Sequence, residues 1–239
     1  MSIKCGWASI DEHGKIKGGK AGDQTGKEVR TGNWYKFGQT AVYRWKDRAK
    51  AKQFADCIES ICNNKNVGYD QGQRGTLNSE LKKLKWDYKK LKTPCECDCY
   101  ALVVAGVNCV MKKEILSPKL YTGNIGNALM DTKMFTKLSG ARYCNSDSYL
   151  AIGDIINHPG SHVIVALANG SKTAAAEKKA VKKAKKSAKA VAKEIVSGKC
   201  SDKRWSSWGT GAIRKNRLKS AGYNYEEVQK EVNRLMAKK

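Results

Sequence analysis

Apolar residues recur at helical spacing in several stretches of the chain. Residues 47–64 place them on one face, at Ala51, Phe54, Ala55, Ile58 and Ile61, and this spacing predicts an amphipathic helix. A more polar helix is predicted over 76–91, with Pro94 ending it. The run 100–111 is almost wholly apolar and predicts a buried helix, and 122–135 predicts another short one.

Strand patterns are concentrated on either side of these helices. Residues 37–45 predict a strand, and 153–170 predict a strand, a turn and a second strand, with Asn169-Gly170 as a tight turn. The Gly-rich stretch 14–35 predicts loops and short strands. Helices first and strands later indicate an α+β domain.

Composition divides the chain into three segments. Residues 1–170 are mixed and form the expected main domain, and residues 171–189 are an Ala/Lys-rich linker, either an exposed helix or a fluctuating spacer. Residues 190–239 predict a small bundle of three short helices, two ending at Gly198 and Gly222 and the third starting from an Asn224 cap.

The charge of the chain indicates a polyanionic partner. There are 46 Lys and Arg against 22 Asp and Glu, a net charge of +24, while 41% hydrophobic residues suffice for a core. Nucleic acid, an anionic membrane and anionic wall polymers all fit such a charge. The basic residues are spread along the chain without a nucleic-acid reading motif, which disfavours specific nucleic-acid binding. No apolar run is long enough to span a membrane, and residues 1–15 lack the apolar core of a secretory signal, so we expect synthesis in a reducing cytoplasm.

The nine cysteines are irregularly spaced and do not form a disulfide pattern. Cys95, Cys97 and Cys99 stand at alternate positions without a second CxxC pair, so a zinc-structured interaction module is the less favoured interpretation. Cys99 follows Asp98 at the start of the apolar helix, where the helix dipole is expected to lower the thiol pKa. His162, which opens the last predicted strand, is the best candidate for its base. His13 and His158 are interpreted as surface residues.

This arrangement resembles the NlpC-type and CHAP-type cysteine peptidases and amidases, papain-like enzymes that cut bacterial peptidoglycan. The matching residues are 98–103, then Gly153-Asp154, then 161–163, with Tyr100 in place of the usual small residue and Ser161 in place of Gly. The stretches GWASIDEHGKIKGGKAGDQTGKEV, GYDQGQRGTL, TPCECDCYALV and YTGNIGNAL also resemble the amidohydrolase domain of phage and prophage endolysins.

The resemblance implies a function and a set of site residues. It implies hydrolysis of a peptidoglycan amide bond by Cys99 and His162 without a cofactor, either as a stem-peptide endopeptidase, which we favour slightly, or as an N-acetylmuramoyl-L-alanine amidase. It also implies that the enzyme waits in the host cytoplasm until lysis and then reaches the cell wall. A third polar residue orients the histidine in this family; Asp23 is slightly favoured over Gln24 and Asn169.

Residues 190–236 are similar to the CW-seven-type cell-wall-binding repeat, through the pattern R-x-x-R-L-x-x-A-G-Y-x-Y-x-x-V-Q-x-x-V-N-x-L. The residues 200–207 stand as an insertion in that pattern. The resemblance implies binding of peptidoglycan, with added attraction of the basic chain to anionic wall polymers. The positions expected to contact the wall are Lys199, Trp208, Arg214, Arg217 and Tyr223. Arg217 and Tyr223 have the alternative role of building the bundle.

Overall fold

The structure is a computed structural model that describes residues 2–184 and 186–237. It divides the chain into two compact units, residues 1–176 and 177–239. The first is a mixed α and β unit built on an antiparallel sheet, and the second is helical. The mixed α+β class predicted from the sequence is therefore confirmed.

The first unit is built on a six-stranded sheet in which every neighbouring pair is antiparallel. In spatial order the strands are β2 (Val29–Asn33), β1 (Lys4–Ala8), β8 (His162–Ala166), β7 (Ile155–His158), β3 (Ala41–Trp45) and β6 (Phe135–Leu138). The predicted strand, turn and second strand over 153–170 are β7 and β8, which pair across the hairpin with His158 opposite His162. The Asn169-Gly170 pair lies beyond this hairpin and leads into a helix.

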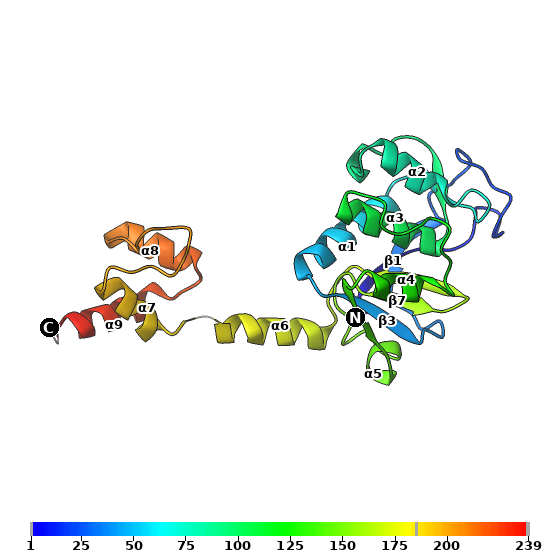
Figure 1. Ribbon diagram of the computed structural model, residues 1–239. Coiled ribbons are helices and arrows are strands. Elements are labelled where there is room, and N and C mark those ends of the chain that lie inside the picture. The colour runs from blue at the N-terminus through cyan, green and yellow to red at the C-terminus, as the bar shows by residue number, and fades with distance from the viewer. Residues whose placement is uncertain (1, 185, 238–239) are drawn as a thin grey trace. The chain divides into compact units, whose positions relative to one another are not determined.

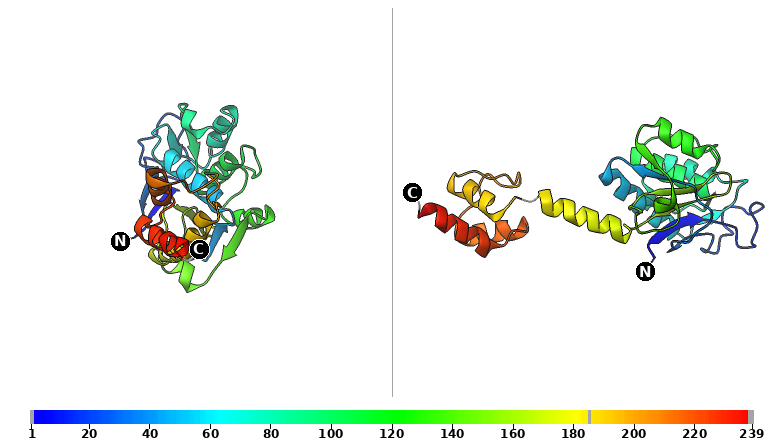
Figure 2. Two further views of the ribbon diagram at one scale, coloured as in Figure 1. Left: turned by 90° about the vertical axis from the view of Figure 1, so that its left-hand side faces the viewer. Right: turned by 90° about the horizontal axis from the view of Figure 1, so that it is seen from below.

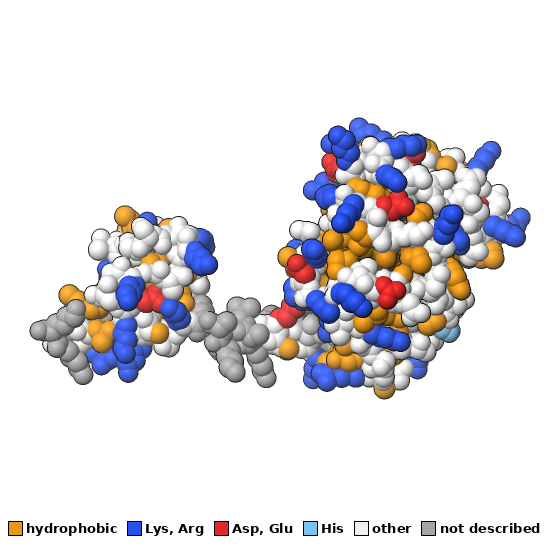
Figure 3. Space-filling view, viewed as in Figure 1, with side chains coloured by type: hydrophobic (Ala, Val, Ile, Leu, Met, Phe, Trp, Pro, Cys, Tyr) orange, Lys and Arg blue, Asp and Glu red, His pale blue; other side chains and the backbone are white. Residues whose placement is uncertain are grey.

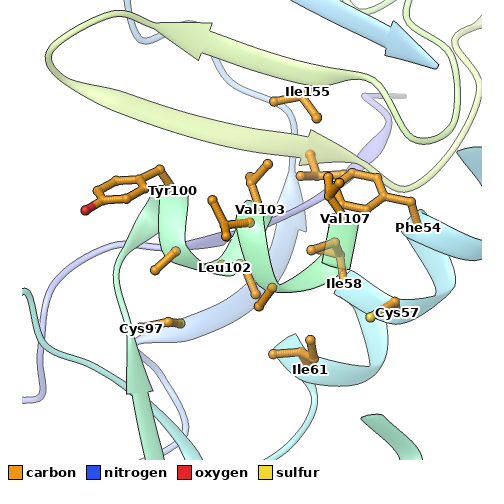
Figure 4. Close-up of a cluster of buried hydrophobic side chains, with 14 of the residues drawn as sticks. Phe54, Cys57, Ile58, Ile61, Cys97, Tyr100, Leu102, Val103, Val107 and Ile155 are labelled. Carbon is orange, nitrogen blue, oxygen red and sulfur yellow. The ribbon is translucent and has the colours of Figure 1, made fainter. Parts of the chain in front are cut away.

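Two helices cover one face of the sheet (Figures 1 and 2). They are α1 (Arg48–Cys62), capped by the Asp47 carboxylate, and α3 (Cys99–Met111). The two helices approach closely at Gly106, where an added Cβ would lie 2.7 Å from both Phe54 and Ile58. Figure 4 shows the apolar side chains that α1, α3 and β7 place between them. This packing fixes the start of α3 against the sheet.

The opposite face of the sheet carries a second, smaller apolar cluster. It is formed by side chains that alternate with those of the first cluster along each strand, as a pleated sheet requires. Its buried members are Ile3, Cys5, Trp7, Val42, Leu150, Ile156, Ile164 and Ala166. The loop residues Trp34 and Phe37 and the short helix α5 (Ala141–Cys144), which contributes Tyr143, pack against it.

A two-stranded parallel sheet precedes α3. It pairs β4 (Val67–Tyr69) with β5 (Cys95–Cys97). Between them lie α2 (Thr76–Lys83) and the 3-10 helix η1 (Tyr88–Lys90), and α4 (Ile125–Asp131) follows α3. The prediction of one helix over 76–91 is wrong beyond Lys83, because Lys85 and Trp86 adopt positive φ angles of 53° and 64°. Burial of Trp86 in the core accompanies this break in the helix.

The rest of the chain is helical. Helix α6 (Ser171–Ala184) occupies the Ala/Lys-rich segment. It is followed by α7 (Ala188–Val196), α8 (Gly211–Ser220) and α9 (Tyr225–Met236), and α9 begins from the predicted Asn224 cap. One apolar cluster of Val191, Ala192, Trp208, Leu218, Val228 and Val232 joins these three helices.

Lys and Arg side chains are spread over the visible face of both units in Figure 3, as the net charge of +24 requires. Among the described residues, no helix combines the length and the apolar character needed to cross a membrane.

Candidate active site and wall-binding module

Cys99 is the first residue of α3, as the sequence predicts. The carboxylate of Asp98 caps the helix by accepting a hydrogen bond of 2.8 Å from the Ala101 N–H group. Nearly every side chain of α3 is buried, so the helix is anchored in the core along its length. Cys99 itself is 7% exposed.

The electrostatics of Cys99 differ from the sequence expectation. The pKa of the thiol is raised to about 12 by burial and by the Asp98 charge, and the N–H groups of Val163, Tyr100 and Cys99 offset this only in part. The helix start therefore does not ionise the sulfur, because removal from water and an adjacent carboxylate outweigh the helix N–H groups. In this state Cys99 is a neutral thiol at pH 7 and needs a base to become a nucleophile.

The sulfur of Cys99 lies beside β8. The backbone N–H of Val163 lies near enough to the sulfur to favour its ionised form and so to lower the thiol pKa. The pairing of β1 with β8 involves Val165 and Ala166, so it does not extend to Val163. The start of α3 thus takes the place of a neighbouring strand at this end of β8, one residue from His162.

His162 stands at the same end of β8 but on the other face of the sheet. Strand alternation groups it with Ile164 and Ala166, whereas Val163 faces the α3 side. Its ring packs edge-on against Phe37, with ring centroids 5.3 Å apart. Among the described residues, no hydrogen bond joins the His162 ring to Cys99. Burial lowers the pKa of His162 to about 4, so its ring is neutral at pH 7.

An aromatic row connects the surroundings of the two residues. Trp7, Tyr35, Phe37 and His162 contact one another in sequence, with successive ring centroids 5.4, 5.4 and 5.3 Å apart. Burial raises the pKa of Tyr35, and Cys99 is close enough to add a smaller contribution. The row therefore extends from the neighbourhood of the sulfur to the imidazole.

The three candidates for a residue that orients His162 have other partners. The Asp23 carboxylate accepts the Lys20 N–H at 2.8 Å, and the Gln24 carbonyl oxygen accepts the Gly22 N–H at 2.9 Å. The Asn169 side chain accepts the Ile152 N–H at 2.8 Å. Asp23 instead belongs to a group of carboxylates around Glu96, whose pKa is raised to about 8 by burial and then by the charge of Asp23.

The Gly153-Asp154 pair has a structural role at the start of β7. Asp154 is fully buried and accepts two hydrogen bonds from the Arg44 guanidinium, at 2.8 and 2.6 Å. Gly153 has a φ of +81°, and an added Cβ would lie 2.5 Å from the Ala51 carbonyl oxygen. This pair fixes the hairpin that carries His162.

Cys95 and Cys97 are packing residues of β5. Both are fully buried, and the Cys97 thiol donates to the Gly68 carbonyl at 3.7 Å. Among the residues that the structure describes, no three His, Cys, Asp or Glu side chains are grouped so that they hold a metal ion.

Two residues near Cys99, Arg74 and Tyr69, were not identified from the sequence. Arg74 lies 3.4 Å from the Asp98 carboxylate and stacks on the Tyr100 ring. Burial raises the pKa of Tyr69, and the nearby Cys99 and Asp98 add to that rise. Arg74 and Tyr69 both lie in the stretch GYDQGQRGTL, which resembles endolysins. This resemblance is the sequence feature that indicates the importance of the stretch, but it assigns no role to either residue.

In the second unit, Trp208 and Glu194 organise the loop before α8. The Trp208 indole is buried and donates to the Glu194 carboxylate at 3.1 Å, which also accepts the Ser201 N–H at 3.0 Å. The ring of Tyr223 packs edge-on against Trp208 at 5.8 Å. The inserted residues 201–204 form one wall of a hollow of about 500 Å³ that Trp208 and Tyr223 also line.

The two predicted wall-binding arginines bond to the protein itself. Arg214 donates to the Gly209 carbonyl at 2.9 Å and to the Gln229 side chain at 3.0 Å, and Arg217 donates to the Ser207 carbonyl at 2.7 Å. These contacts hold the loop 207–209 against α8 and α9. Lys199 is exposed after α7.

Comparison with known families gives one match in each part of the chain. The family described as an endolysin-like domain matches residues 5–173, and the family described as a CW_7 repeat matches residues 189–236. The first match covers more than half of the chain, so the chain belongs to the endolysin-like domain family. Comparisons with curated proteins and with solved structures give no match.

These families confirm the broader predictions drawn from the sequence. An endolysin-like domain joined to a cell-wall-binding repeat indicates a lytic protein that acts on peptidoglycan and binds the bacterial wall.

Proposed function

We propose that the chain is a cysteine peptidoglycan hydrolase of papain-like type, with Cys99 as the nucleophile and His162 as the general base. The observation that carries the proposal is the position of the Cys99 sulfur, at the start of a buried helix and against the N–H of Val163, next to His162. The endolysin-like family of the chain supplies the substrate class.

The reaction begins with a neutral pair. The raised pKa of Cys99 and the lowered pKa of His162 oppose a thiolate–imidazolium pair before substrate binds, so both groups start neutral. The thiol proton moves to the imidazole only as the sulfur attacks an amide carbonyl. Because the His162 ring has no hydrogen bond to the sulfur among the described residues, this step requires the ring to turn past Phe37 toward the edge of β8 when substrate binds. Backbone N–H groups at the start of α3 then stabilise the oxyanion.

The remaining steps release the amine and hydrolyse the thioester. The imidazolium donates its proton to the leaving amine, and the carbonyl carbon stays on the sulfur as a thioester. Water then gives a proton to His162 and its oxygen to the carbonyl carbon, and the proton returns to the sulfur as the carboxylic acid leaves. Asp23 stays a prediction for the orienting residue; that role would require it to exchange its present Lys20 contact.

The bond that is cut is proposed to lie within the stem peptide, with the bond between N-acetylmuramic acid and L-alanine as the second candidate. Mass spectrometry of wall fragments after digestion by the full chain tests both. New amino termini within the stem peptide support an endopeptidase, and new amino termini on L-alanine support an amidase. New reducing sugar ends without a new amine contradict an amide hydrolase of either type.

The C-terminal unit is proposed to hold the enzyme on its substrate. Its CW_7 repeat supports wall binding, and the hollow beside Trp208 and Tyr223 is the site that we propose for the wall fragment. Arg214 and Arg217 would support that site by holding the loop 207–209 in place. The basic surface adds attraction to anionic wall polymers, which weakens as salt is raised.

A further inference from the structure

Arg74 and Tyr100 form a pair beside the start of α3. The Arg74 guanidinium lies 4.9 Å from the centre of the Tyr100 ring, close enough for a cation–π contact. Its only hydrogen bond among the described residues is a long one of 3.4 Å to Asp98, the cap of the helix that begins with Cys99. A guanidinium has five N–H donors, and the side chain of Arg74 is 33% exposed, so most donors remain available to a ligand.

The hydroxyl of Tyr100 has no partner within the protein. Tyr100 is 3% exposed, and its hydroxyl oxygen is buried without a hydrogen bond among the described residues. In Figure 4 the hydroxyl points away from the apolar cluster of α1 and α3. A buried hydroxyl without a hydrogen-bond partner is energetically unfavourable. Asp98, Arg74, Cys99 and Tyr69 are its charged or ionisable neighbours, so Tyr100 lies beside the proposed active site.

We infer that Arg74 and Tyr100 form a subsite that binds a carboxylate of the peptide substrate next to the Cys99 sulfur. The inference rests on the proposed function for the position of the reaction. Both groups are hydrogen-bond donors, and the planar fork of an arginine matches the two oxygens of a carboxylate. Asp98, the carboxylate that pairs with Arg74, is 2% exposed and also accepts the Ala101 N–H, so it faces the helix and leaves the outer side of Arg74 to the ligand.

The subsite also explains why a tyrosine follows the cysteine in this sequence. Tyr100 occupies the position after the cysteine where the resembled enzymes have a small residue. A small side chain here would not reach Arg74, whereas the tyrosine ring supports the guanidinium and adds a donor. Its phenol remains protonated at neutral pH, because burial and the Asp98 charge raise the pKa of Tyr100.

The test is a binding measurement on the full chain carrying Cys99→Ala, which prevents turnover. The probes are alanyl-γ-glutamyl-lysyl-alanine with free carboxylates and the same peptide with its carboxylates converted to amides, measured by calorimetry. We expect the free acid to bind about tenfold or more tightly than the amide, as a charged hydrogen-bonding pair requires. Arg74→Gln and Tyr100→Phe should each reduce this preference.

Matched controls separate binding from folding. Arg142 stacks on Tyr149 at 4.1 Å elsewhere in the unit, so Arg142→Gln should keep the preference. Tyr100→Phe should not lower the melting temperature, since it removes a hydroxyl that has no partner. The subsite is overturned if the two peptides bind equally or if neither binds. It is also overturned if Arg74→Gln keeps the preference for the free acid. Wall clearing by the Cys99→Ala protein overturns the proposed function instead and leaves the binding result standing.

Discussion

The Cys99 sulfur at the start of α3 lies near the backbone N–H of Val163 in β8, which acts to lower the thiol pKa. This contact joins two segments that are far apart in the sequence and places the thiol one residue from His162. The side chains of the two residues lie on different sides of β8, so the local backbone holds them near each other without a direct bond. The catalytic pairing that we propose therefore requires the His162 side chain to change its orientation when a substrate binds.

The buried imidazole of His162 predicts loss of stability in acid. Its pKa is lowered from 6.5 to about 4, so folding excludes the proton, and this contribution is present above pH 6.5 and lost as the pH falls through 4. At about 1.4 kcal/mol per pKa unit, the contribution is up to about 3 kcal/mol. Urea unfolding at pH 7 and pH 4.5 should show a smaller loss in His162→Gln than in the wild type. His13→Gln, at an exposed residue, should behave as the wild type; equal losses in all three proteins contradict the prediction.

Gly153 is predicted to be irreplaceable for steric reasons. Alanine at this position would combine a φ of +81° with a Cβ 2.5 Å from the Ala51 carbonyl oxygen, and we expect a cost of about 3 kcal/mol in the free energy of unfolding. Gly160 is the matched control, since its φ is +79° but an added Cβ would meet nothing within 4 Å. Gly160→Ala should cost only about 1 kcal/mol, from the backbone angle alone. Similar costs at both positions, measured by urea unfolding, would show that the contact with Ala51 is unimportant.

Glu194 is predicted to make the C-terminal unit sensitive to acid. Burial alone would raise its pKa, but hydrogen bonds from Lys186, Trp208 and Ser201 lower it to about 2. The stabilisation is present above pH 4.5 and lost as the pH falls through 2. At pH 7, Glu194→Gln should weaken hydrogen-exchange protection of the α7 and α9 amides by about 2 kcal/mol. The exposed Glu227→Gln should leave protection unchanged, and equal protection in Glu194→Gln contradicts the role of Glu194.

The sequence predicted the elements whose signals are local. The Asp98 cap followed by an apolar run located the start of α3 correctly, and the strand, turn and strand predicted over 153–170 contain the β7–β8 hairpin, although Asn169-Gly170 is not its turn. Local patterns did not predict the strands β4, β5 and β6, which have three or four residues each and are held by their partners. The break of the predicted helix after Lys83 likewise depends on the tertiary burial of Trp86.

The candidate site was likewise predicted only as far as local sequence patterns determine it. Residue types identified Cys99 and His162, but the pKa of Cys99 depends on burial by segments distant in sequence, and local helix geometry predicted the wrong direction. The orientation of His162 depends on the register that sets it opposite His158, which a sequence pattern does not specify. Arg74 was missed because it reaches Asp98 only through the packing of the segment between β4 and α2.

The most direct test of the proposed chemistry is wall clearing by the full chain carrying Cys99→Ala. Clearing of purified bacterial walls, followed by turbidity, is expected to disappear in this variant, while sedimentation with walls and the unfolding transition stay as in the wild type. Cys97→Ala is the matched control: it removes a buried sulfur two residues away, and it should clear walls. Clearing by a folded Cys99→Ala protein at the wild-type rate would contradict the account.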